Sequence, residues 1–169
     1  MLYIGHSQQT QLGEIWVAMT DIGLAAISFP VSEIEFSSRL RKNSKGEIVF
    51  DQEKIEGAAF ELEKYILGQL KEFTLKIDWT FMGSFQQKVL KVTMKIPFGE
   101  TRSYKAIAND IGLPGAARAV GKAEATNPVP IIIPCHRVLG VDGKLHGYSA
   151  GQGLETKKWL LALERGSNP

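Results

Sequence analysis

The only cysteine of this chain, Cys135, is followed directly by His136, one of three histidines in its 169 residues. Three consecutive isoleucines stand before it at 131–133, with a proline on each side of the run. The run predicts a buried, strand-like segment, and Pro134, which has no N–H to donate, should end regular pairing just before the thiol. A thiol held there beside an imidazole could act as a nucleophile. Because free cysteine is among the most buried residue types, an inert core thiol is the alternative.

Composition sets the broad class of the protein. Hydrophobic residues make up 44% and charged residues 22%, values typical of a soluble globular protein. A single cysteine excludes an internal disulfide, and the scattered positions of His6, Cys135 and His146 do not predict a metal site. The N-terminal residues do not resemble a secretion signal, and no apolar run is long enough to span a membrane. We therefore expect a cytoplasmic protein that needs no metal.

Charge is divided unequally along the chain. Residues 1–83 contain 8 basic and 12 acidic side chains, whereas residues 84–169 contain 12 basic and 6 acidic ones. A basic second half suggests a polyanionic partner, of which nucleic acid is the simplest, although a chance excess would look the same.

The first half predicts a small α/β domain over residues 1–80 with a scaffolding role. Three short apolar runs at 2–6, 14–20 and 24–29 predict strands of a short antiparallel sheet, with a hairpin turn at 21–23. Ser32 and Glu35 have capping-box spacing and predict the start of a helix that reaches about Arg41. Two further elements are a possible strand at 47–50 and an amphipathic helix at 52–67. Residues 73–79 predict either a strand or an extended linker.

The second half predicts a mainly α-helical domain over residues 84–169. Ser84 and Gln87 again have capping-box spacing, for a helix to about residue 95. Ser103 suits the N-cap of a short helix over 104–111, and Pro114 suits the first turn of a second helix. Such a pair predicts a helix-turn-helix. A last helix is expected over 154–165, with Glu164 at its end, where a charge is usually solvated.

Together these segments resemble the O6-alkylguanine-DNA alkyltransferases, also called methylated-DNA–protein-cysteine methyltransferases. The resemblance covers residues 84–165 and rests on short motifs in the family's order: Ser103-Tyr104, the run 116–121, Asn127-Pro128, the Pro-Cys-His-Arg-Val run at 134–138, Gly147-Tyr148-Ser149, and Leu160-Leu161 with Glu164. The first half suits the family's variable N-terminal α/β domain.

The resemblance implies a single-turnover transfer without a cofactor. The thiolate of Cys135 would attack the alkyl carbon on guanine O6, and on O4 of alkylthymine, to leave an S-alkylcysteine. An unperturbed thiol has a pKa of about 8.5, so it needs a base or a positive environment. By resemblance, His136 is that base, acting through a water and oriented by Glu164. Asn127 would tie the recognition helix to the active-site turn.

The resemblance also implies double-stranded DNA containing alkylated guanine as the partner, bound by a monomer that can act cooperatively. The damaged base would leave the duplex, Arg118 would fill its place in the stack, and Tyr104 would crowd the 3′ phosphate. Alone, Arg118 would more often be a surface charge. Further DNA-binding positions are Ser103, Ala117, Ala119, Gly121 and Lys122. Substrate-binding positions are Tyr148, Ser149, Val138, Pro130 and Lys157.

The chain departs from the family's pattern in two places, and each of the other possible functions conflicts with part of the sequence. Some relatives bind zinc through N-terminal cysteines that this chain lacks, and Gln152-Gly153 after Ala150-Gly151 departs from the usual loop. A non-catalytic module that binds alkylguanine lesions has its cysteine replaced, whereas Cys135 is present. A Cys-His hydrolase would leave the basic half unexplained, and a DNA-binding regulator would leave residues 134–138 unexplained.

Overall fold

The computed structural model describes residues 1–44 and 46–166. The chain divides into two compact units, one over Met1–Phe81 and one that begins at Met82. Within the described residues, no helix is both long enough and apolar enough to cross a membrane.

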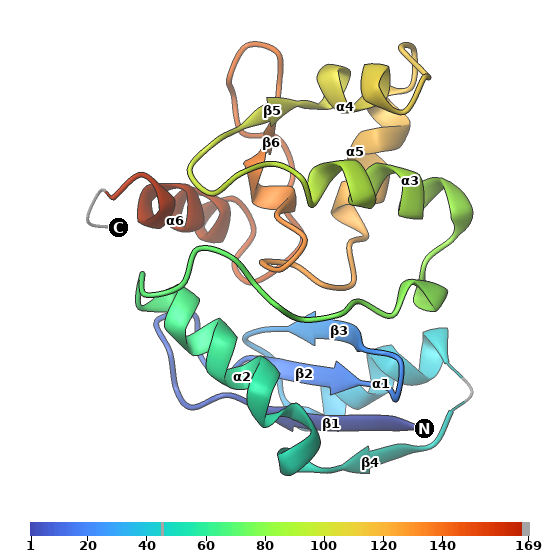
Figure 1. The fold of residues 1–169 in the computed structure, drawn as a ribbon, viewed down its shortest axis with the longest axis vertical. Helices are drawn as coiled ribbons and strands as arrows, with labels where there is room; N and C mark the ends of the chain where they lie inside the picture. The colour runs from blue at the N-terminus through green and yellow to red at the C-terminus, as the bar shows by residue number, and fades with distance from the viewer. Residues whose placement is uncertain (45, 167–169) are drawn as a thin grey trace. The chain divides into compact units, whose positions relative to one another are not determined.

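The first unit is built on a four-stranded sheet in the order β3-β2-β1-β4 (Figure 1). The strands are β1 (Leu2–His6), β2 (Trp16–Met19), β3 (Leu24–Ser28) and β4 (Ile48–Phe50). Strands β1, β2 and β3 pair antiparallel, as the sequence predicts, and the hairpin turn at 21–23 is confirmed. Strand β4 instead joins β1 in parallel, so the sheet is mixed. Helix α1 connects β3 to β4, so that β4 can run in the same direction as β1 and pair with it in parallel.

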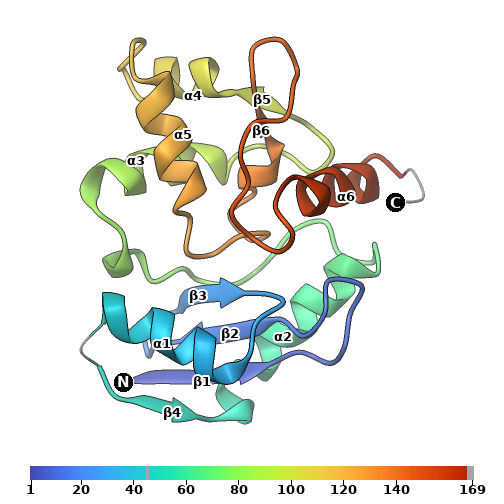
Figure 2. The same ribbon diagram turned by 180° about the vertical axis from the view of Figure 1, so that it is seen from behind.

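Two helices cover opposite faces of this sheet, as the front and back views show (Figures 1 and 2). Helix α1 (Glu33–Asn43) starts at the predicted N-cap, where the Ser32 hydroxyl accepts from the N–H of Glu35. Its residues Phe36 and Leu40 pack with Leu2 and Ile4 of β1 in one core. Helix α2 (Gln52–Ile66) lies on the other face, where Gly5 leaves no room for a side chain: a Cβ there would be 2.5 Å from Ile55.

The residues after α2 run as the extended linker that was one of two expectations. Ile77 makes only an isolated bridge to Leu24, and a 3₁₀ turn follows at Trp79–Phe81.

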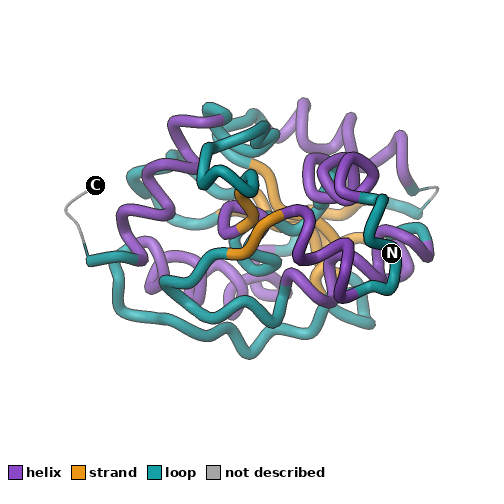
Figure 3. Tube along the Cα trace, turned by 90° about the horizontal axis from the view of Figure 1, so that it is seen from above, coloured by secondary structure: helices purple, strands orange, loops and turns teal. Residues whose placement is uncertain are grey.

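The second unit is mainly helical, and across the whole chain helix and loop outweigh strand (Figure 3). Its helices are α3 (Ser84–Thr93), α4 (Tyr104–Asp110), α5 (Ala117–Ala125) and α6 (Leu154–Glu164). Helices α3, α4 and α5 share a core that contains Val89, Ile107 and Val120. A two-stranded parallel ladder, β5 (Arg102–Ser103) with β6 (Val138–Leu139), connects the start of α4 to the segment after Cys135.

Two of the four predicted helix starts in this unit need correction, and the start of α6 at Leu154 is as predicted. Helix α3 is capped by Gly83 without a side-chain hydrogen bond, so Ser84 is the first helical residue and the predicted capping box is wrong. Helix α5 begins at Ala117, and Pro114 lies in the preceding turn because Ile111–Gly115 is needed to reverse the chain. The start of α4 is also right: the Ser103 hydroxyl accepts from the N–H of Ala106 at 3.0 Å. The predicted fold class, an α/β domain followed by a helical domain with a helix-turn-helix, is confirmed.

Candidate active site

The isoleucine run before the cysteine is buried, as predicted, but it is a tight turn and not a strand. Ile131 has φ 75°, a left-handed value that is rare for a β-branched residue. The chain folds back there, so that the N–H of Ile133 donates to the carbonyl of Val129 at 3.0 Å. The prediction failed because an apolar run indicates burial without deciding the backbone path.

The side chain of Asn127 holds this turn together. Its amide nitrogen donates to the carbonyl of Ile133 at 2.9 Å, and its amide oxygen accepts from the N–H of Val129 at 3.0 Å. The same nitrogen lies 3.2 Å from the sulfur of Cys135. One amide therefore shapes the turn and contacts the thiol, while Pro130 is buried within the turn.

Cys135 begins a 3₁₀ turn, Cys135–Arg137, and its side chain is only 5% exposed. Burial raises the pKa of its thiol to about 12, and the nearby Glu124 carboxylate adds to the increase. The hydrogen bond from Asn127 and the positive charge of Lys157 act in the opposite direction. In the absence of a ligand the thiol is therefore protonated, and ionisation depends on the groups that stabilise a thiolate.

The two residues after the thiol converge on one buried carboxylate, that of Glu164. The Nε2 atom of His136 lies 2.7 Å from its Oε1. Arg137 donates from Nε to both carboxylate oxygens, at 3.1 and 2.9 Å, and from Nη2 to Oε1 at 2.8 Å. The N–H of Gly99 donates to Oε2 at 3.0 Å. Glu164 is thus not the solvated charge that its position at a helix end suggests when taken alone, because α6 packs this end of the helix against the reactive turn.

His136 is completely buried, and burial lowers its pKa in spite of the opposing effect of Glu164. The neutral imidazole is consequently the resting form. A carboxylate only accepts hydrogen bonds, so Nε2 carries the ring hydrogen and Nδ1 is the nitrogen that can take up a proton.

Lys157 is a fully buried lysine beside the same site. Its ammonium donates to the carbonyl of Val138 at 2.7 Å and to that of His146 at 3.1 Å. The hydroxyl of Tyr104 also donates to the carbonyl of His146, at 3.0 Å. Burial raises the pKa of Tyr104 to about 12 and lowers that of Lys157. These contacts connect β6, the loop at 140–147 and the start of α4.

A hollow of about 470 Å³ lies over the second helix of the helix-turn-helix. Arg118 is exposed and lines this hollow. A Cβ added to Gly121 would lie 3.8 Å from the Tyr104 ring. The lining residues come from α4, α5 and the following loop: Tyr104, Lys105, Ala117, Arg118, Gly121, Ala125, Gly140, Val141, Asp142, His146 and Gly147. Ala119 and Lys122 are exposed on α5 but line a different hollow, and Ser103 is used as a helix cap.

The loop that carries Tyr148 and Ser149 contacts the end of α5. The Ser149 hydroxyl donates to the carbonyl of Ala125, and Tyr148 is half-buried. Thus the structure groups the predicted residues into three sets: Asn127 with Cys135, His136 with Glu164, and Lys157 with Tyr104 and Val138. Arg118 is exposed and lines the hollow over α5, outside these three sets.

Sequence reasoning assigned no role to Arg137 or Glu124. Arg137 donates hydrogen bonds to the Glu164 carboxylate. Its place directly after the Cys-His pair was the sequence signal that could have indicated this role. Glu124 is buried in the last turn of α5 and hydrogen-bonded to Thr93, and burial raises its pKa to about 7. The sequence signal for Glu124 was the presence of an acidic residue among the small residues of α5. Among the described residues, no group of three His, Cys, Asp or Glu could hold a metal ion.

Comparison with known proteins decides the family. Residues 84–166 match the sequence model described as the DNA-binding domain of 6-O-methylguanine DNA methyltransferase, and residues 3–79 match the model of its ribonuclease-like domain. The chain belongs to the 6-O-methylguanine DNA methyltransferase family. The resemblance seen in the sequence is thus confirmed.

Individual members of the methyltransferase family match most of the chain. The methylated-DNA–protein-cysteine methyltransferase of Methanosarcina barkeri is 41% identical over 158 residues, which cover 92% of this chain and 93% of that protein. The protein of that name from Mycolicibacterium paratuberculosis is 53% identical over 114 residues, 67% of each chain. A crystal structure of Mycobacterium tuberculosis OGT in complex with DNA has a TM-score of 0.81 and 38% identity, and covers 98% of this chain and 92% of that one.

Proposed function

We propose that this protein repairs alkylated DNA as a methylated-DNA–protein-cysteine methyltransferase, with Cys135 as the irreversible acceptor. The observation that carries the proposal is the contact of the Asn127 amide with the Cys135 sulfur, on a turn whose next residue is a neutral, carboxylate-bound histidine. The family's named members and its DNA complex support DNA as the partner. A cytoplasmic location and a scaffolding role for the first unit are parts of the same proposal.

The transfer needs no co-reactant. The Cys135 sulfur forms a bond to the alkyl carbon as the bond from that carbon to guanine O6 breaks, and the bonding electron pair stays on O6. The thiol proton passes to His136 through a bridging water and finally replaces the alkyl group on guanine. Glu164 stabilises the transient imidazolium through its 2.7 Å contact with Nε2. The S-alkylcysteine has no route back, since a thioether is a poor leaving group, and each molecule therefore acts once.

Substrate placement follows from the residues around the hollow. We assign Arg118 to the space in the stack left by the rotated base, because it is an exposed cation of the second helix of the helix-turn-helix and lines that hollow. Tyr104 is assigned to the 3′ phosphate, and Ser103, Ala117, Ala119, Gly121 and Lys122 to the surrounding DNA. The base itself is assigned to Tyr148, Ser149, Val138 and Pro130, with Lys157 holding the Val138 carbonyl in place.

Intact-protein mass spectrometry after incubation with an O6-methylguanine oligonucleotide tests the proposal. One added methyl group, about 14 Da, should appear on the peptide that contains Cys135 and saturate at one per molecule. The Cys135→Ser variant is the control: it should gain no mass yet still bind the oligonucleotide. An unchanged wild-type mass with the oligonucleotide bound would replace the proposal with a non-catalytic lesion-binding module. An unchanged mass without binding would contradict the proposal and favour a Cys-His hydrolase instead.

A further inference from the structure

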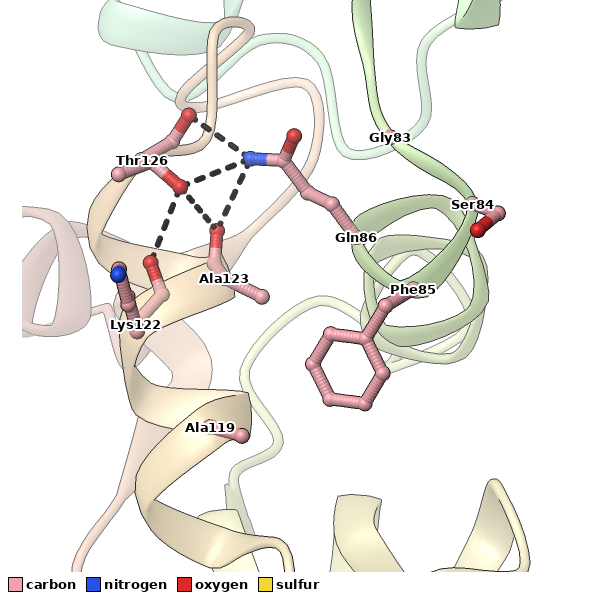
Figure 4. Close-up of a pocket in the computed structure, with 8 residues that line it drawn as sticks. All are labelled: Gly83, Ser84, Phe85, Gln86, Ala119, Lys122, Ala123 and Thr126. Carbon is pink, nitrogen blue, oxygen red and sulfur yellow. Dashed lines mark hydrogen bonds between the residues drawn. The ribbon is translucent and has the colours of Figure 1, made fainter.

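The last turn of α5 is held from outside by the side chain of Gln86, a residue of α3. The carbonyl oxygens at the end of a helix have no partners within the helix and must find donors elsewhere. The Nε2 atom of Gln86 lies 2.9 Å from the Thr126 carbonyl, 2.9 Å from the Thr126 hydroxyl and 3.3 Å from the Ala123 carbonyl (Figure 4). One amide nitrogen thus reaches three oxygens of this turn.

The chemistry of these oxygens decides which way the amide faces. Two of them are carbonyls, which only accept, and the Thr126 hydroxyl lies 3.0 Å from the Lys122 carbonyl, to which it donates its own hydrogen. An oxygen of Gln86 in that position would face three acceptors, whereas the nitrogen can share its two hydrogens among them. The contact therefore depends on an amide donor and not only on the size of the side chain.

A second contact from α3 holds the same turn. The hydroxyl of Thr93 is hydrogen-bonded to Oε1 of Glu124, and both side chains are buried. Gln86 and Thr93 lie at opposite ends of α3, so the helix binds the end of α5 at two points. The position of this turn therefore depends on contacts with α3 as well as on the hydrogen bonds within α5.

The turn leads directly to the residue that contacts the thiol. Asn127 follows Thr126, and its backbone N–H donates to the Glu124 carbonyl at 3.1 Å. Its side chain then reaches the Cys135 sulfur at 3.2 Å. A shift of Thr126 would move the backbone from which Asn127 extends, and hydrogen bonds to sulfur weaken quickly with distance and angle.

We propose that Gln86 is a positioning residue for alkyl transfer, because its amide holds the α5 turn from which Asn127 reaches the Cys135 thiol. This inference rests on the proposed function for its consequence in repair, but the contact itself acts on the thiol without DNA. Loss of the Gln86 donor should weaken the hydrogen bond that favours the thiolate and make the thiol less acidic.

Gln86→Glu tests the inference, with Gln87→Glu as the matched control. The glutamate keeps the shape of the side chain but has no donor, and its charge faces carbonyl oxygens. Gln87 is the next residue of α3 and is also half-buried, and its amide donates at 3.0 Å to the carbonyl of Met82, which is not part of α5. Both variants change the charge equally. The titratable groups around the thiol, Glu124, Lys157, Tyr104 and His136, are unchanged in both variants.

The readout is the rate of Cys135 alkylation by iodoacetamide as a function of pH, followed by mass spectrometry. Gln86→Glu should slow alkylation about tenfold near neutral pH and move the pH profile upward by about one unit, whereas Gln87→Glu should stay within about twofold of wild type. Gln86→Lys, which can again donate, should recover most of the rate. Transfer from free O6-methylguanine base should follow the same order.

An identical pH profile for Gln86→Glu and Gln87→Glu would overturn the inference, even if the first variant melts at a lower temperature. A structural role alone lowers stability without moving thiol acidity. If Gln86→Glu does not fold, Gln86→Ala, which leaves the oxygens to water, takes its place with the same criterion. A wild-type protein that shows the expected thiol profiles but never removes methyl groups from DNA would contradict the proposed function and leave this inference standing.

Discussion

His136 and Glu164 are 28 residues apart in the chain, yet Nε2 of the imidazole lies 2.7 Å from Oε1 of the carboxylate, and both side chains are buried. Arg137 binds the same carboxylate, so the two residues that follow the thiol share one acceptor. The carboxylate therefore orients the base and neutralises a buried guanidinium at once.

Glu164→Gln should lower both stability and repair. The amide cannot balance the Arg137 charge and cannot accept every donor that now points at the carboxylate. Removing one partner of a buried ion pair costs about 3–5 kcal/mol, so we expect the free energy of unfolding to fall by about 3 kcal/mol in urea titrations. The transfer rate should fall as well, because a neutral amide stabilises an imidazolium poorly.

Glu155→Gln is the matched control for that change. It makes the same substitution in the same helix at an exposed glutamate that pairs with Lys158, and an exposed pair of this kind contributes little. Equal effects of the two substitutions on unfolding and on transfer would contradict the role given to Glu164.

Glu124→Gln should change how stability depends on pH. Burial raises the pKa of Glu124 from 4.5 to about 7 in the folded protein. Between these values the folded state binds more protons than the unfolded state, so the Glu124 contribution to wild-type stability is present at low pH and is lost as the pH rises through about 7. Glutamine does not titrate. Relative to wild type, the variant should gain on the order of 2 kcal/mol in unfolding free energy between pH 5 and pH 8.

Urea unfolding of both proteins at pH 5 and pH 8 measures this difference directly. A second consequence concerns the thiol: because the Glu124 carboxylate adds to the raised pKa of Cys135, Glu124→Gln should make the thiol more acidic. A stability difference that does not change with pH would show that Glu124 does not titrate in this range.

Arg118→Ala should separate duplex repair from chemistry. Arg118 is exposed on α5, whereas Cys135, His136 and Glu164 are buried. The variant should lose about tenfold or more in the transfer rate from duplex DNA, while transfer from free O6-methylguanine base stays close to wild type. Lys158→Ala removes an exposed charge from α6 and serves as the control for net charge. Equal losses on the two substrates would rule out the intercalating role.

Much of this architecture follows from signals close together in the chain. Ser32 and Ser103 cap their helices as their spacing predicts, and apolar periodicity locates β1, β2, β3 and α2. The reactive pair is recognisable because Cys135 and His136 are adjacent in the sequence, and because motifs of the same family stand before and after them. Local signals suffice there because capping, turns and amphipathic faces depend on residues a few positions apart.

Other features exist only through contacts between distant segments. The isoleucines at 131–133 read as a strand, but the Asn127 side chain provides hydrogen bonds that bend them into a turn. Glu164 reads as a solvated charge until α6 packs it against the reactive turn. Gln86 is an ordinary helix residue until the end of α5 lies beside it. Burial and hydrogen bonding set the acidity of these groups, and both depend on which segments meet when the chain folds.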